Sequence, residues 1–287
     1  MKATTFEFRF RFWILVAIFA LGFTAPWDRA LHLDGTGPNT HVWGQLAVAL
    51  SRAGVNITAA FNVVLVVGIV FAFAGAALRT WATANLGPEV MRGETLRGGS
   101  VSTSVEGAEH LADAEHEGNS PFAARRMGHP ELVVEGPYRF VRNPLYLGAW
   151  LNALALALLM PPSGAIFTLV LLVVFQLRLM LAEEAWLGEK LGAAYSEYCA
   201  RVPRIVPTVR AGAARSHPSG AWMGHPQLKR WGNAALAEIF LWGTAISFAA
   251  VGWQYNAHLL IQCVLVSLGL ALVVMGTAMP AAAPQAR

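Results

Sequence analysis

The residues best suited to chemistry lie between positions 136 and 207. Arg142-Asn143-Pro144 places a guanidinium beside an amide, and the adjacent carboxylates of Glu183 and Glu184 follow some forty positions later. Arginine can bind a carboxylate through two parallel hydrogen bonds, and a carboxylate can hold an ammonium group or hydroxyls. These groups could therefore bind the charged ends of a small ligand, provided that the fold brings them together.

Six apolar blocks must position these groups. A helix needs roughly 20 apolar residues to cross a hydrocarbon core of roughly 30 Å, so four blocks are long enough and the first and third are short. Pro161-Pro162 ends the third block and predicts a tight antiparallel hairpin with the fourth. The segments 142–148 and 178–184 should then end at the same membrane face. The blocks are Phe12–Ala25, Ile57–Leu78, Leu145–Met160, Gly164–Ala182, Ala234–Trp253 and His258–Thr277.

Composition and charge support a membrane protein. Apolar residues make up 55% of the chain and charged residues 13%, which excludes a disordered chain. With a cytoplasmic N-terminus, the outward segments would hold only Arg29 and Arg52 of the 21 lysines and arginines. The sequence thus predicts an all-α polytopic membrane helix bundle of about six transmembrane helices, with both termini cytoplasmic. The same asymmetry explains the net charge of +4 without a nucleic-acid partner.

The first block has an alternative reading as a secretory signal peptide. It follows a positive segment and is short, but Phe23 stands where cleavage after Ala25 would need a small residue. A retained helix is the favoured interpretation. The apolar run Val42–Leu50 is too short to span and predicts an interfacial helix or a lead-in to the second span.

The spans and the segments between them predict five regions. Histidines 110 and 116 lie in an acidic tract without fixed ligand spacing, so we expect no metal site there. The regions are N-terminal membrane helices at 1–78, a partly disordered cytoplasmic loop at 79–135, a core of a helical hairpin and a cytoplasmic helix at 136–210, a cytoplasmic linker at 211–232, and two C-terminal membrane helices at 233–287.

Several residues in these regions also have structural interpretations. Arginines at the membrane edge satisfy the preference for positive charge inside, and tyrosines anchor helices at the interface. Arg178 lies inside an apolar helix, where an ionisable group usually faces a cavity or a partner, with snorkelling as its alternative. Glu238 near the start of the fifth span is expected to snorkel. Tyr195 and Tyr198 are three residues apart and should share a helix face.

A set of spaced motifs resembles the isoprenylcysteine carboxyl methyltransferase and phospholipid methyltransferase superfamily. The motifs are Gly136-Pro-Tyr-Arg-Phe-Val-Arg-Asn-Pro-Leu-Tyr-Leu-Gly148, Arg178 with Glu183-Glu184, and Leu187, Gly192, Tyr195, Tyr198, Val202-Pro-Arg204 and Pro207. Upstream, Leu78-Arg-Thr-Trp-Ala-Thr-Ala-Asn-Leu-Gly87 is also similar to bacterial members. The resemblance covers about residues 78–207, which is under half of the chain.

The resemblance implies a membrane-embedded methyltransferase that uses S-adenosyl-L-methionine. The acceptor would be a lipophilic carboxylate or amine, or a lipid, which enters from the bilayer at the cytoplasmic face. Arg178 and Glu184 are the candidate catalytic residues. Asn143 replaces the histidine of many relatives, so no titratable imidazole is present at this position. The candidate cofactor-binding residues are Tyr138, Arg142, Asn143, Pro144, Tyr146, Gly148, Glu183, Glu184, Tyr198 and Arg204.

Two alternatives stay open at the level of sequence. Sterol-type membrane reductases resemble the same stretch and use NADPH, but the paired glutamates and the residues around Arg142 favour the methyltransferase. A binding or transport protein on the same scaffold would be expected to have lost charged motif residues, and all of them are present.

Overall fold

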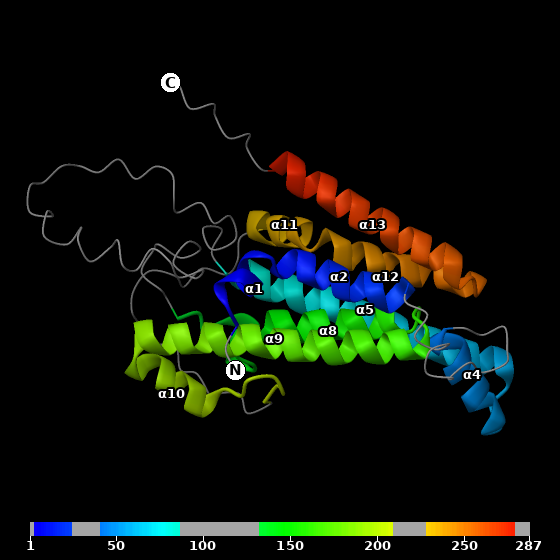
Figure 1. Ribbon diagram of the computed structural model, residues 1–287, viewed down its shortest axis with the longest axis horizontal. Helices are drawn as coiled ribbons and strands as arrows, with labels where there is room; N and C mark the ends of the chain where they lie inside the picture. The colour runs from blue at the N-terminus through cyan, green and yellow to red at the C-terminus, as the bar shows by residue number, and fades with distance from the viewer. Residues whose placement is uncertain (1–2, 25–40, 87–131, 209–227, 279–287) are drawn as a thin grey trace, which may run out of the picture. The chain divides into compact units, whose positions relative to one another are not determined.

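The computed structural model describes residues 3–24, 41–86, 132–208 and 228–278, and every regular element they form is helical (Figure 1). The part predicted as a partly disordered loop, apart from residues 79–86 and 132–135, lies outside the described residues, as do His110 and His116. The helices are α1 (Thr5–Arg9), α2 (Arg11–Thr24), α4 (Val42–Arg52), α5 (Ile57–Asn85), η3 (Gly136–Arg139), α8 (Pro144–Ala157), α9 (Pro162–Leu191), α10 (Ala193–Arg201), α11 (Leu228–Ala237), α12 (Ile239–Val251), η4 (Gly252–Gln254) and α13 (Ala257–Ala278).

Three helices are long and apolar enough to cross a membrane, namely α5, α9 and α13. Helices α11 and α12 count as a fourth candidate when taken together, although the chain bends by 75° between them. The predicted first and third spans are the 14-residue helices α2 and α8. At about 1.5 Å per residue, each is about 21 Å long and too short to cross the hydrocarbon core unaided. The all-helical fold is confirmed, and the described residues contain three to four candidate membrane spans; six spans with cytoplasmic termini stay a prediction.

The exposed faces of the long helices fit a lipid environment. Valines 63, 66, 67 and 70 of α5 are exposed, as are Ile166, Val170 and Val174 of α9 and Leu265, Val266 and Val273 of α13. Exposed apolar stripes of this extent mark a surface that meets apolar surroundings. Inside α12, the hydroxyls of Thr244 and Ser247 donate to the carbonyls four residues earlier, which satisfies them without water.

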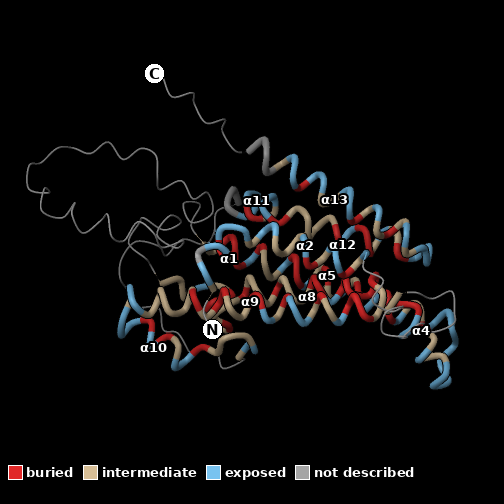
Figure 2. The backbone as a smooth tube through the Cα atoms, viewed as in Figure 1, coloured by how far each residue is buried: buried red, intermediate tan, exposed pale blue. Residues whose placement is uncertain are grey.

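The chain forms two compact units, and helices α2, α5, α8 and α9 contribute residues to both, α8 only its first residue, Pro144, to the second of the two described below. One unit contains residues 19–81, 145–170 and 226–287. Its buried core includes Leu65, Leu159, Met160 and Phe248, and α12 packs along α13. Figure 2 marks the buried positions along the helices in red. Helix α4 joins this core through Trp43, whose indole donates to the Phe61 carbonyl at 3.2 Å. The prediction of a helix over Val42–Leu50 is therefore confirmed, extended by two residues to Arg52.

Two glycine contacts bring helices of this unit close together. A Cβ on Gly164 of α9 would collide with the backbone of Gly22 in α2, and a Cβ on Gly148 of α8 would lie 2.6 Å from Cγ of Arg79 in α5. Gly75 of α5 lies against the backbone of Gly148 in the same way. Glycine is needed at these positions because larger residues would push the helices apart.

The other unit contains residues 1–18, 82–144 and 171–225. Tyr195, Tyr198 and Val202 form its buried apolar cluster, and the two tyrosine rings are 6.1 Å apart, so the predicted shared helix face is confirmed. The segment after α10 returns along the segment before α8, because the amide of Arg142 donates to the Pro203 carbonyl at 2.9 Å. The amide of Thr208 likewise donates to the Phe140 carbonyl at 2.9 Å. These bonds place residues 202–208 beside residues 140–143.

Candidate functional site

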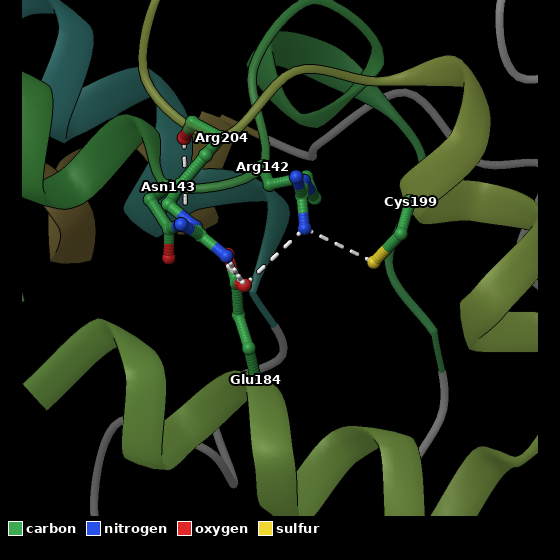
Figure 3. A network of polar contacts seen from close by, with 5 residues as sticks. All are labelled: Arg142, Asn143, Glu184, Cys199 and Arg204. Atoms are coloured by element: carbon green, nitrogen blue, oxygen red, sulfur yellow. Dashed lines mark hydrogen bonds and ion pairs between the residues drawn. The ribbon is translucent and has the colours of Figure 1, made fainter. Parts of the chain in front are cut away.

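The carboxylate of Glu184 lies at the centre of a network of polar side chains (Figure 3). It accepts hydrogen bonds from Asn143 Nδ2 at 3.1 Å and from Arg204 Nε and Nη2 at 3.0 and 2.8 Å. Arg142 Nη1 forms an ion pair with Glu184 Oε2 at 3.2 Å, the oxygen that also accepts from Arg204 Nη2. The Glu184 side chain is only 11% exposed. A carboxylate at this depth needs charged partners, because taking it out of water otherwise costs several kcal/mol.

The backbone explains why these three donors converge. Helix α8 begins at Pro144, a residue that suits the first turn of a helix, and the side chain of the preceding Asn143 reaches Glu184 on α9. Glu184 comes from the second half of α9, and Arg204 from the return after α10. The predicted convergence of the segments around Arg142 and Glu184 is thus confirmed by a direct hydrogen bond. Asn143 Nδ2 also lies 3.3 Å from the carbonyl oxygen of Arg204.

Arg142 is held by a partner that the sequence did not suggest. Its Nη1 donates to the Cys199 sulfur at 3.1 Å, so the guanidinium lies between the thiol and Glu184 (Figure 3). Its Nε is buried and makes no hydrogen bond to any residue that the structure describes. A buried donor without a partner is costly, and an acceptor group of a bound ligand would satisfy it.

Two tyrosines close one side of this network. The Tyr198 hydroxyl donates to the Tyr138 carbonyl at 2.8 Å, which fixes α10 to the short helix η3. Burial, followed by the repulsion of Glu184, raises the pKa of Tyr195 well above its usual value, and burial also raises the pKa of Tyr198. Both hydroxyls therefore stay protonated at physiological pH. The hydrogen bond to Glu184 raises the pKa of Arg204, so the guanidinium stays charged.

The contacts described above do not account for four further predicted cofactor-binding residues, which are Pro144, Tyr146, Gly148 and Glu183. Glu183 is half-buried next to Glu184 on α9, so its side chain points about 100° away around the helix axis. Tyr146 and Gly148 belong to the other unit. The stem of Arg79 passes over Gly148, which explains the glycine by packing. A cofactor-binding role for these residues stays a prediction.

Arg178 has a partner close to the N-terminus of the chain. Its Nε and Nη2 donate to the two carboxylate oxygens of Glu7, each at 2.9 Å. Glu7 is also part of a capping box with Thr4 at the start of α1. The hydrogen bond from Arg178 lowers the pKa of Glu7 to about 2. Arg178 therefore faces a partner, as one of the sequence interpretations expected, and its role in orienting an acceptor stays a prediction.

The expectation that Glu238 snorkels is wrong. Glu238 is buried and accepts hydrogen bonds from Arg79 Nε at 2.7 Å and Nη2 at 2.9 Å. An oppositely charged partner on a neighbouring helix removes the need to reach water. In the sequence, Arg79 lies in the motif Leu78–Gly87 at the start of the predicted cytoplasmic loop, and neither feature indicates a carboxylate partner. The signal that could have predicted this pair is the presence of one basic and one acidic residue in two separate apolar segments.

The comparisons with known proteins point to methyltransferases, and the family match includes part of the site described above. Residues 88–194 match the phospholipid methyltransferase family. Protein-S-isoprenylcysteine O-methyltransferase B of Arabidopsis thaliana is 33% identical over 132 residues, which cover 45% of this chain and 61% of the relative. The protein-S-isoprenylcysteine O-methyltransferase of Schizosaccharomyces pombe is 35% identical over 89 residues, which cover 30% of this chain and 37% of that relative.

The resemblance to this methyltransferase superfamily is confirmed. The chain spans less than two thirds of the length of either relative. No solved structure gives a significant match. Of the polar network, Arg142, Asn143 and Glu184 lie inside the matched residues 88–194, whereas Cys199 and Arg204 lie beyond them.

Proposed function

We propose that the chain is an integral membrane methyltransferase that uses S-adenosyl-L-methionine and methylates a lipophilic carboxylate or amine at the cytoplasmic face. The observation that carries the proposal is the convergence of Arg142, Asn143 and Arg204 on Glu184, within or next to the stretch that resembles methyltransferases. The relatives are named for methylation of S-isoprenylcysteine, which is a lipophilic acceptor of the same class.

The donor set fits the proposed cofactor. S-adenosyl-L-methionine carries a carboxylate, an ammonium group, ribose hydroxyls and a sulfonium from which a methyl group can be transferred. The unsatisfied Nε of Arg142 fits an acceptor such as the carboxylate, and Glu183 or Glu184 fits the ammonium or a hydroxyl. Tyr138 or Tyr146 could place a ring against the sulfonium. Pro144, Gly148 and Tyr198 would shape the pocket.

The chain's contribution to the reaction would be mainly one of position. Methyl transfer is an in-line displacement, so holding the acceptor and the methyl group in line supplies much of the rate. A carboxylate acceptor attacks without losing a proton and yields a methyl ester. An amine acceptor must lose a proton, which Glu183 or Glu184 would accept. Arg178 would orient the polar head of the acceptor once Glu7 releases it.

The topology belongs to the same proposal. We propose six membrane segments with both termini cytoplasmic, in which α2 and α8 use thinned bilayer or flanking aromatic side chains to reach the interfaces. The cytoplasmic regions would be 79–135 and 211–232, and the core of the site would lie in 136–210. Membrane lipids are then the surroundings of the apolar faces of α5, α9 and α13.

Binding of radiolabelled S-adenosylmethionine to the detergent-purified protein tests the proposal, with NADPH binding measured in parallel. Saturable binding that S-adenosylhomocysteine displaces is expected. Binding of NADPH alone would assign the chain to the reductases, and binding of neither ligand by folded protein would favour a non-catalytic scaffold.

A further inference from the structure

Arg79 connects two helices of one unit through different nitrogens of one guanidinium. Its Nε and Nη2 bind the carboxylate of Glu238, and its Nη1 donates to the carbonyl oxygen of Leu145 at 3.2 Å. Leu145 lies in the first turn of α8, one residue after Pro144. The stem of Arg79 passes directly over Gly148, where any larger residue would collide with it. The side chain therefore touches the first turn of α8 at two points.

Glu238 holds this guanidinium from an unusual position in the fold. It is the residue between α11 and α12, where the chain bends by 75°, and its side chain is only 6% exposed. The break between α11 and α12 therefore supplies the carboxylate of the ion pair. Nearby, the Trp242 indole donates to the Thr80 hydroxyl at 2.9 Å, so the same two segments are also joined by a neutral bond.

Stability alone does not account for a buried ion pair at this place. Removing two charges from water costs about as much as their attraction returns, and apolar replacements of similar volume are often as stable or more stable. The best-attested use of such pairs is to fix a register. In this protein the pair would fix the position of α8, because the Leu145 carbonyl oxygen in that helix accepts a hydrogen bond from Arg79.

We propose that Arg79 is a positioning residue that fixes the first turn of α8, and that Glu238 orients it from the break between α11 and α12. Asn143, which donates to Glu184, lies two residues before Leu145 in the chain, so a loosened first turn of α8 would be felt at Asn143 through the continuous backbone. Glu238, although it lies outside the matched residues 88–194, would thereby influence residues within them. This inference rests on the proposed function for its effect on cofactor affinity.

Two variants and a matched control test the inference in the full-length protein. Glu238→Gln keeps the shape of the side chain but loses the charge that orients Arg79. The double variant R79E/E238R restores an ion pair with reversed charges, but a glutamate at position 79 cannot donate to the Leu145 carbonyl. Trp242→Phe removes the neutral bond to Thr80 and leaves Arg79 untouched.

Three measurements separate positioning from general stability: thermal unfolding, the affinity for S-adenosylmethionine, and hydrogen–deuterium exchange in peptides that cover residues 140–150. We expect E238Q to weaken the affinity about tenfold and to accelerate exchange in residues 142–148. The double variant should regain thermal stability without regaining the affinity. W242F should lower stability while affinity and exchange stay at the wild-type level.

The outcomes distinguish this inference from the proposed function. If the wild type binds no S-adenosylmethionine but E238Q still accelerates exchange at 142–148, the proposed function fails and the positioning role stands. Unchanged exchange in E238Q overturns the positioning role, whether or not the wild type binds the cofactor. Full recovery of affinity in the double variant also overturns it, because an ion pair alone would then suffice.

Discussion

Arg204 binds Glu184 with two nitrogens across 20 residues of chain, with Nη2 2.8 Å from Oε2 and Nε 3.0 Å from Oε1. The pair joins the return after α10 to the second half of α9. Arg142 approaches the same carboxylate, so two guanidiniums share one negative charge. The network therefore carries an excess of positive charge that a ligand carboxylate would balance.

Glu184→Gln should abolish measurable binding of S-adenosylmethionine. The amide is uncharged, so it no longer holds the two guanidiniums in position for the ligand, and we expect the affinity to fall at least about a hundredfold, which corresponds to about 2.8 kcal/mol. Titration of the detergent-purified variant with the labelled cofactor measures this loss. Glu197→Gln is the matched control, because Glu197 forms an exposed ion pair with Arg201 on α10. Equal affinities in the two variants would remove Glu184 from the site.

Tyr198→Phe should lower stability without unfolding the protein. The variant leaves the Tyr138 carbonyl without its buried donor, at a cost of about 1 kcal/mol. Thermal unfolding should shift down by about 2–4 °C. Ser196→Ala on the same helix is the control, because the Ser196 hydroxyl only returns to the exposed carbonyl of Gly192. If S196A lowers the unfolding temperature as much as Y198F does, any substitution on α10 is destabilising, and the loss in Y198F does not come from the hydrogen bond to Tyr138.

The ion pair between Glu7 and Arg178 predicts a stability difference that depends on pH. The pKa of Glu7 is lowered from 4.5 to about 2 in the folded chain, so the pair contributes fully above pH 4.5 and its contribution is lost as the pH falls toward 2. Because the Glu7 side chain is 20% exposed, we discount the contribution to about 1 kcal/mol.

Unfolding temperatures of the wild type and Glu7→Gln across this range check the prediction. Their difference should be constant from pH 8 to pH 5 and should shrink below pH 4.5. A difference that stays constant down to pH 3 would show that the side-chain charge of Glu7 contributes nothing.

The sequence predicted the elements of the fold better than the contacts between their side chains. Apolar blocks and prolines are local signals, so the starts of α8 and α9 were predicted within two residues, although α9 continues to Leu191, nine residues beyond the predicted Ala182. The motifs from Gly136 onward pointed to Asn143, Glu184 and Arg204. The pairs Arg79–Glu238 and Arg178–Glu7 join residues 159 and 171 positions apart. No local pattern specifies such partners, because they depend on how the helices pack. Helices α2 and α8 were also predicted to be short, but whether they cross the membrane depends on the local thickness of the bilayer.

Gly164→Leu should destabilise the protein clearly, because Gly164 is buried where α9 meets α2. A Cβ at position 164 meets the carbonyl of Gly22, which is backbone and cannot rotate away, so α2 and α9 must separate. Overpacking of this kind costs about 1–3 kcal/mol, and Gly164→Ala should show a smaller part of the same loss. Gly269→Ala on α13 is the matched control, since nothing described lies within 4 Å of its Cβ position and alanine favours a helix. Thermal unfolding in detergent should therefore rank the variants with G164L lowest, G164A next, and G269A at or above the wild type. If G164A proves as stable as G269A, then α2 does not pack against α9 at this point, because no backbone contact would resist the added methyl group.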